Sequence, residues 1–264
     1  MGRLEGKCAI ILGAASRGNM GQAIARHFSK EGAKVVVAGR HREELERLAG
    51  EIGGWSAYCD IADSADIEKL ARFGEDVMGG VSIAVNCTGW GLLKPFLDTD
   101  GEDLSKMANV QFIGPFQFFQ AMIKAMQNGG SIIQISSAVS RIMFENHAAY
   151  MGTKAAIDHV VRCVANEFGS RNIRANTISP GLTETEMVAE FKALPGAFDA
   201  FERRYPLGRI GTCDDIACAA VWLASDECFM TGENLQVNGG LPLRGNPTQQ
   251  EIEASIANAA AKND

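Results

Sequence analysis

The sequence predicts one α/β domain in which short, buried parallel strands alternate with helices. Continuous apolar runs at residues 7–12, 34–39 and 131–135 are typical of strands that a parallel sheet buries on both faces. A glycine-rich turn joins the first of these runs to a helical pattern. The chain has 264 residues, which fits one large α/β domain, and no linker or repeat indicates a second core.

The composition excludes several classes of protein. A net charge of −7 argues against nucleic acid or an anionic membrane surface as the main partner. Seven cysteines without a C-x-x-C spacing indicate neither a disulfide framework nor a zinc site, and we expect no metal. There is no signal-peptide pattern and no apolar run of roughly 18 residues. We therefore expect a soluble, cytoplasmic protein.

The turn after the first strand has the composition of a phosphate-binding loop. Glycines there let the backbone approach a pyrophosphate, with the amino terminus of the helix over residues 22–31 facing the anion. The second strand, residues 34–39, completes the β-α-β unit that such a motif requires. We expect cofactor contacts in this turn from Gly13, Ser16, Arg17, Gly18, Met20 and Gly21.

The end of the second strand predicts which dinucleotide binds. An acidic residue there favours NAD, whereas a cation favours the 2′-phosphate of NADP. Here the strand runs into Arg40 and Arg42, Arg17 adds a further cation from the glycine turn, and the first carboxylate is Glu43. We predict NADP(H) in preference to NAD(H). The alternative is that Arg40 and Arg42 only solvate the start of the next helix.

Two further strand ends carry candidate cofactor contacts. The third strand, residues 55–59, is followed by Asp60 and Ile61. Asp60 is placed to accept from an adenine amino group, or to cap the helix that begins near Ser64. The fourth strand ends at Asn86, and Gly89 then lets the backbone pass close beneath a flat cofactor. The alternative for Asn86 and Gly89 is an ordinary turn.

A serine, a tyrosine and a lysine carry the predicted chemistry. Ser137 follows the strand at residues 131–135, and Tyr150 and Lys154 stand four apart at the start of a helical pattern over residues 150–168. A neighbouring cation should lower the tyrosine pKa from about 10 towards the range of acid–base catalysis. The alternative is an ordinary pair on a solvated helix face.

The remaining segments follow the same alternation. Residues 100–126 predict two helices, and residues 214–223 another, before a last strand at residues 234–237. The segment at about residues 183–212 is rich in Phe and Met and has the position of a substrate lid. A stripe of apolar residues of this kind is, however, more often part of the core. The polar, Ala-rich tail from residue 241 is either a loose helix or an arm onto a neighbouring subunit.

Taken together, the glycine turn, Asn86-x-x-Gly89, and Ser137 with Tyr150-x-x-x-Lys154 resemble the short-chain dehydrogenase/reductase family over residues 4–240. The resemblance implies a single-domain doubly wound Rossmann fold, with a seven-stranded parallel sheet and helices on both faces. It also implies a homotetramer that interconverts a secondary alcohol and a ketone of a small-molecule substrate.

The resemblance assigns roles to individual residues. Tyr150 is the acid/base, Lys154 tunes it and binds the nicotinamide ribose, and Ser137 orients the substrate. Ser137 is preferred to Ser136 because it lies thirteen positions before the tyrosine. The residues expected to contact the cofactor after the sixth strand are Pro180, Gly181, Thr183 and Thr185.

The chain departs from the family pattern in three places. Leu12 replaces the usual threonine of the glycine loop, two residues are inserted, and Asn19 stands where the middle glycine is usual. Asn-Cys-Thr-Gly replaces Asn-Asn-Ala-Gly. Gln111 aligns with the fourth catalytic residue, an asparagine that holds a water in the proton relay to lysine, and we expect Gln111 to take this role; Asn109 would need an insertion.

Several functions compete. The leading one is NADP-linked oxidoreduction of an apolar, 3-oxoacyl, steroid-like or cyclic substrate. A catalytically impaired nucleotide-binding sensor or subunit partner of the same fold is the alternative, favoured by the altered glycine loop and Gln111. Nucleotide-sugar epimerases share Tyr-x-x-x-Lys but generally have a longer carboxyl-terminal region.

Overall fold

A seven-stranded parallel sheet forms the centre of the molecule. The computed structural model describes residues 2–261, and only the backbone at Met187 and Ala189. The strand order is β3-β2-β1-β4-β5-β6-β9, and all pairs are parallel. The strands are β1 (Cys8–Leu12), β2 (Lys34–Gly39), β3 (Trp55–Tyr58), β4 (Ile83–Asn86), β5 (Gly130–Ile135), β6 (Ile173–Pro180) and β9 (Asn234–Val237). The order reverses between β1 and β4, which is where ligands bind in open α/β sheets.

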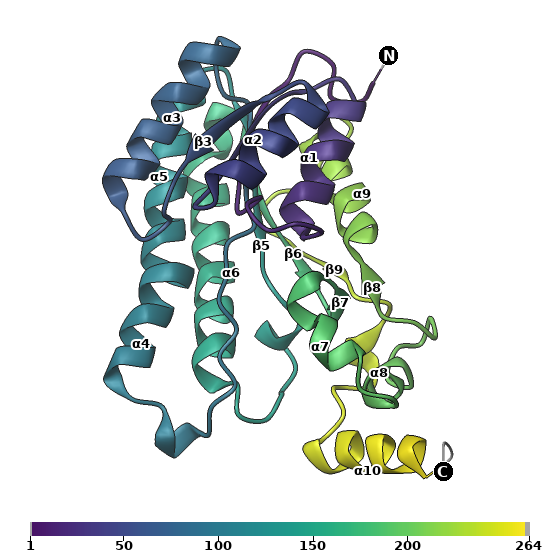
Figure 1. Ribbon diagram of the computed structural model, residues 1–264. Coiled ribbons are helices and arrows are strands. Elements are labelled where there is room, and N and C mark those ends of the chain that lie inside the picture. Colours follow the sequence, from purple (N-terminus) through teal and green to yellow (C-terminus); the bar gives the residue numbers. More distant parts are fainter. Residues whose placement is uncertain (1, 262–264) are drawn as a thin grey trace.

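Helices cover both faces of this sheet, as Figure 1 shows. On one face lie α3 (Ser64–Met78), α5 (Gly114–Ala125) and α6 (Ala148–Phe168), and on the other α1 (Met20–Lys30), α2 (Arg42–Ile52) and α9 (Cys213–Ala224). Successive strand residues point to opposite faces, so Ile10 enters the first core and Ile11 the second. The predicted doubly wound, three-layer α/β fold is confirmed.

Side-chain caps fix where two of the helices begin. Asn19 caps α1, because its Oδ1 accepts from the backbone N–H of Gln22 at 2.9 Å. Asp63 caps α3 by accepting from the N–H groups of Ala65 and Asp66. The expectation that Asp60 might serve as this cap is wrong, because Asp60 instead accepts from the N–H of Ala62.

The two helices predicted across residues 100–126 are joined without a break. After α4 (Gly101–Ala108) the chain makes one π-helical turn, η2 (Asn109–Ile113), and continues into α5. A Cβ on Gly114 would overlap the carbonyl oxygen of Ile61, so this residue must be glycine for the helix to approach the end of β3 so closely. The extra residue in the π turn places Gln111 in the interior.

The segment after β6 forms a third, smaller core with the carboxyl-terminal helix. It contains β7 (Thr183–Glu184), η5 (Glu186–Val188), α7 (Ala189–Lys192), α8 (Ala197–Glu202), β8 (Gly211–Thr212), η6 (Leu241–Leu243) and α10 (Gln249–Ala260). Phe201, Tyr205 and Ile252 are buried together, with Phe191 and Phe198 packed at the edge. The Phe- and Met-rich stripe of the expected substrate lid is therefore mainly core, although Leu194 within it is exposed. The side chain of Met187, also counted in that stripe, lies outside the described residues.

The tail is an ordered helix. Thr248 caps α10 through a capping box with Glu251, and Ile252 anchors the helix beside α8 (Figure 1). Of the two alternatives for the tail, the structure has a helix, but it packs on its own chain. Short 3₁₀ turns complete the fold at η1 (Phe96–Asp98), η3 (Ala138–Ser140) and η4 (Gly169–Arg171).

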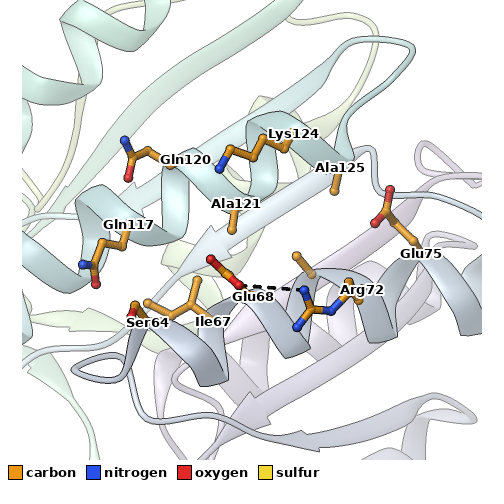
Figure 2. A pocket seen from close by; sticks show the side chains of 11 residues that line it. Ser64, Ile67, Glu68, Arg72, Glu75, Gln117, Gln120, Ala121, Lys124 and Ala125 are labelled. Carbon is orange, nitrogen blue, oxygen red and sulfur yellow. Dashed lines mark ion pairs between the residues drawn. The ribbon is translucent and has the colours of Figure 1, made fainter.

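A groove of about 420 Å³ lies between α3 and α5 (Figure 2). Its walls combine apolar residues such as Ile67 and Ala121 with polar side chains, which include Gln117 and Lys124 of α5 and the Glu68–Arg72 ion pair of α3, at 3.8 Å. None of its lining residues belongs to the strand ends where the predicted site residues gather. In the part of the chain that is described, no helix is both long and apolar enough to cross a membrane.

Candidate active site

The predicted site residues share one edge of the sheet because parallel strands place their carboxyl ends together. The structure places them at the last residue of, or after, β1 (Gly13, Ser16, Arg17, Gly18, Met20, Gly21), β2 (Arg40), β3 (Asp60, Ile61), β4 (Asn86, Gly89), β5 (Ser137) and β6 (Pro180, Gly181, Thr183, Thr185). Tyr150 and Lys154 come to the same edge from the first turns of α6, and Gln111 from the π turn.

Lys154 is a buried cation at the centre of this edge. Its side chain is 3 % exposed, and its Nζ donates to the carbonyl of Ile135 at 2.9 Å, where β5 ends. The same Nζ lies 5.5 Å from the centroid of the Tyr150 ring. Ser137 lies beside the phenol, and its hydroxyl interacts with Tyr150 so as to favour the phenolate. Serine, tyrosine and lysine are thus brought to one place.

Burial shifts the pKa values of Tyr150 and Lys154 away from those expected from the sequence. Burial raises the pKa of Tyr150 to about 12, and the opposing effect of Ser137 is smaller. Burial also lowers the pKa of Lys154 to about 8, against the Asp158 carboxylate and the Cys87 thiol, which favour the ammonium. The predicted lowering of the tyrosine pKa is therefore wrong for the protein alone, because burial raises the pKa of Tyr150 and only the Ser137 hydroxyl opposes it.

The amide oxygen of Gln111 and the ammonium of Lys154 both border the space next to Gly89. The side chain is 2 % exposed, its Nε2 donates to Thr153 Oγ1 at 3.2 Å, and its Oε1 has no hydrogen-bond partner. A Cβ built on Gly89 would lie 3.4 Å from this Oε1 and 3.7 Å from Lys154 Nζ. Both polar atoms therefore border the space that glycine leaves open. Buried acceptors are rarely left unpaired, so this space suits a polar ligand or a water.

The glycine turn is held closed by an asparagine side chain. Asn19 Nδ2 donates to the Gly13 carbonyl at 2.8 Å while its Oδ1 caps α1. A Cβ on Gly21 would lie 2.6 Å from the Gly13 oxygen, and one on Gly13 would lie 2.7 Å from the Cys87 carbonyl carbon. Only glycine fits at both positions. The resulting close turn, with the amino terminus of α1 behind it, fits the pyrophosphate of a dinucleotide.

Two of the three predicted arginines remain at the mouth of this turn. Arg42 stacks over the Tyr58 ring, with its guanidinium 4.6 Å from the centroid. Arg17 and Arg40 are both about two-thirds exposed, and each lies near one carboxylate: Arg17 is 3.5 Å from Glu44, and Arg40 is 3.8 Å from Asp60. The turn after β2 contains no carboxylate of its own, but Asp60, which follows β3, lies near Arg40 in the folded chain.

Two residues predicted to contact the cofactor, Asn86 and Ile61, have side chains that are already engaged within the protein. Asn86 is fully buried, donating to Gln134 Oε1 at 2.8 Å and accepting from the Thr88 N–H at 3.1 Å. Ile61 packs in the core beneath α3 and α5. A cofactor would meet the backbone at these positions. Among residues 2–261, no cluster of His, Cys, Asp and Glu has the grouping that holds a metal ion.

Two residues near the site were not predicted from the sequence. Tyr205 is fully buried, donates to the Leu182 carbonyl at 3.2 Å, and lies where a Cβ on Gly181 would be. It therefore fixes the backbone after β6, and a tyrosine at the end of an amphipathic stripe was its only signal. His147 stacks on the ring of Tyr150 at a centroid distance of 4.3 Å. Its only signal was its place one turn before the tyrosine.

Comparison with known proteins identifies the family. Residues 13–242 match a family model described as enoyl-(acyl carrier protein) reductase. A short-chain type dehydrogenase/reductase from Mycobacterium ulcerans superposes with a TM-score of 0.88 at 25% identity, over 96% of this chain and 98% of the other. The chain belongs to the short-chain dehydrogenase/reductase family.

Characterised members of this family are similar over almost their whole length. The chain is 34% identical to the D-threitol dehydrogenase of Mycolicibacterium smegmatis, over 92% of this chain and 95% of the relative. It is 36% identical to the NADP-dependent (R)-specific alcohol dehydrogenase of Lentilactobacillus kefiri, over 90% and 97%. As a short-chain dehydrogenase/reductase, the chain is an oxidoreductase that uses a nicotinamide cofactor, which argues against the sensor alternative.

The close turn around Gly21 can be tested by adding one methyl group. Gly21→Ala should weaken NAD(P)H binding roughly tenfold or more, because the new Cβ must push the Gly13 carbonyl out of place. Gly50→Ala in α2 is the matched control, since no atom lies within 4 Å of its Cβ. Titration of nicotinamide fluorescence measures both. Equal affinities for the two variants would contradict this placement of the cofactor.

Proposed function

We propose that the chain is an NADP(H)-dependent oxidoreductase that interconverts a secondary alcohol and a ketone, with Ser137, Tyr150, Lys154 and Gln111 as its catalytic residues. The observation that carries this proposal is the buried Lys154 ammonium beside the Tyr150 phenol and the unpaired Gln111 oxygen. A protein that only binds a nucleotide has no need for a buried cation whose pKa is lowered by the loss of water.

Different residues at the sheet edge would bind different parts of the cofactor. The turn from Gly13 to Gly21 would hold the pyrophosphate, and Lys154 would donate to the nicotinamide ribose. Pro180, Gly181, Thr183 and Thr185 would border the carboxamide, on the backbone that Tyr205 fixes. The bound nicotinamide supplies or accepts the hydride. The protein supplies orientation and a proton.

Tyr150 would exchange the proton with the substrate oxygen. Because its pKa is about 12, the phenol keeps its proton at neutral pH and is set to donate as a ketone is reduced. Oxidation of the alcohol needs the phenolate, so its rate should increase as the pH rises towards that pKa. Ser137, beside the phenol, would hold the substrate oxygen in the same place.

Gln111 would replace the asparagine of its relatives in the proton route. Its free Oε1 and the Lys154 ammonium border the same space under Gly89, where one water could accept from Lys154 and donate to the amide. The π turn compensates for the longer side chain by changing the position of the backbone at residue 111.

The preference for NADP(H) rests on Arg17 and Arg40. Both guanidinium groups are exposed at the mouth of the glycine turn, at the end of β2 where an adenine ribose would lie. Their carboxylate neighbours, at 3.5 Å and 3.8 Å, are not in close hydrogen-bonding contact. A 2′-phosphate would compete for these cations, and one similar enzyme is NADP-dependent.

The substrate is proposed only as a small secondary alcohol or ketone. The relatives described above act on D-threitol and on alcohols, and the aromatic stripe of this chain packs largely into its own core.

We propose that residues 183–212 form the lid over the site, since Glu186 lies beside Gly18 of the glycine turn. We further propose a cytoplasmic homotetramer, supported by exposed Leu104, Ile113 and Phe116 on neighbouring turns of α4, η2 and α5.

The role of Tyr150 is tested by removing its hydroxyl. Tyr150→Phe should reduce ketone turnover by about a hundredfold or more, since it removes the general acid but leaves the ring in place. The screen would use NADPH with acyclic and cyclic ketones, ketosugars, 3-oxoacyl thioesters and ketosteroids. NADPH affinity, measured by fluorescence, should stay the same. Undiminished turnover in Tyr150→Phe would refute the proposed mechanism.

The cofactor preference is tested at Arg40. Arg40→Ala should raise the KM for NADPH roughly tenfold and leave that for NADH nearly unchanged, because a charge-assisted hydrogen bond contributes about 1.5–3 kcal/mol. Arg42→Ala is the matched control, because Arg42 is stacked on Tyr58. A wild-type enzyme that prefers NADH, or equal effects of Arg40→Ala on both cofactors, would contradict the assignment.

A further inference from the structure

His147 lies against the ring of Tyr150, at the start of α6. The two rings are nearly parallel, with an interplanar angle of 22° and a centroid distance of 4.3 Å. Phe144 meets the imidazole edge-on, at 6.0 Å and 89°. The imidazole is therefore held between Phe144 and Tyr150, and it covers one face of the tyrosine ring.

The imidazole has a fixed orientation because its Nδ1 is 2.6 Å from the carbonyl oxygen of Leu92. A carbonyl only accepts, so Nδ1 carries the proton and donates it. Burial lowers the pKa of His147, and the hydrogen bond to Leu92 opposes this less strongly. The ring is therefore neutral near pH 7, and it contributes shape and orientation rather than charge.

The backbone reinforces this contact. The N–H of Lys94 donates to the carbonyl of Asn146 at 2.7 Å. Asn146 has a φ of 57°, a left-handed turn conformation that asparagine adopts more readily than most other non-glycine residues. Two hydrogen bonds thus join residues 92–94 to residues 146–147, directly before the helix that carries Tyr150 and Lys154.

The same loop touches both halves of the catalytic group. It leaves β4 at Asn86 and passes Gly89, where the backbone borders Gln111 and Lys154. Three residues later, Leu92 holds His147 against Tyr150. The Lys154 ammonium, on the same helix, lies 5.5 Å from the centroid of the Tyr150 ring, and the ammonium of Lys94 in the loop is paired with Asp100 and Asp103.

We propose that His147 is a positioning residue: its imidazole, fixed by Leu92, holds the Tyr150 ring in one orientation and keeps water from that face. The orientation of Tyr150 then depends on ring stacking and not on a charge on the imidazole. This inference rests on the proposed role of Tyr150 as acid/base. It predicts that the two contacts of His147 are separable by substitution, since an aromatic ring can keep the stack and an amide can keep the hydrogen bond.

Two variants separate the contacts. His147→Phe keeps a ring on Tyr150 but loses the donor to Leu92. His147→Asn places an amide N–H near the position of Nδ1 but removes the ring. His159→Asn, on an exposed position of the same helix, is the control. The measurements are kcat and KM for ketone and NADPH, and the pH dependence of alcohol oxidation between about pH 8 and about pH 11.5, a range that reaches the pKa of about 10 of a solvated phenol.

We expect His147→Asn to lower kcat about tenfold, with the KM for NADPH unchanged, because Tyr150 loses its orientation but the cofactor site is intact. Water would then reach the phenol, and its pKa would fall, so alcohol oxidation should level off at a lower pH than in the parent enzyme. His147→Phe should keep kcat within about threefold and retain the parent pH profile.

Two results would overturn the inference: a parent-like kcat and pH profile in His147→Asn, or a loss of kcat in His147→Phe at least as large as that in His147→Asn. The second result would show that the Leu92 hydrogen bond, which His147→Phe removes, contributes at least as much as the stack. Tyr150→Phe separates this inference from the proposed function. If Tyr150→Phe is inactive while both His147 variants match the parent, the function stands and only the role of His147 fails.

Discussion

The active-site edge depends on one buried cation, the ammonium of Lys154. Removing it from water lowers its pKa to about 8, so in the neutral range the charged form costs on the order of 3 kcal/mol of stability. The sign follows from the lowered pKa: the cost is fully present below about pH 8 and disappears as the pH rises towards the unfolded value. The Ile135 carbonyl, at 2.9 Å, offsets part of it. A fold tolerates such a group where the chemistry requires it.

Two departures from the family pattern place an amide side chain at the site. Asn19 stands where a glycine is usual, and its amide both caps α1 and holds the Gly13 carbonyl. Gln111 stands where an asparagine is usual, and a π turn keeps its amide oxygen near Lys154. At both positions an amide side chain therefore lies among the polar groups of the site.

The sequence predicted the strands and the edge at which the site forms, because buried parallel strands have a distinct pattern and their carboxyl ends must meet. It could not predict the cap of α3, since Asp60 and Asp63 are chemically equivalent until the backbone places one of them. The aromatic stripe was ambiguous for a similar reason: Phe201 is core only because α10 folds back over it. The raised pKa of Tyr150 depends on burial depth, a tertiary property that residue spacing does not encode.

The most direct test of the account is the turnover of Gln111→Ala and Gln111→Asn with NADPH and a ketone substrate. If the amide oxygen shares a water with Lys154, Gln111→Ala should lose about tenfold or more in kcat, while NADPH affinity stays unchanged. Gln111→Asn, which keeps the amide one methylene further back, should fall between Gln111→Ala and the parent. Full turnover in Gln111→Ala would show that the buried Lys154 works without this partner, and the proposed proton route would be wrong.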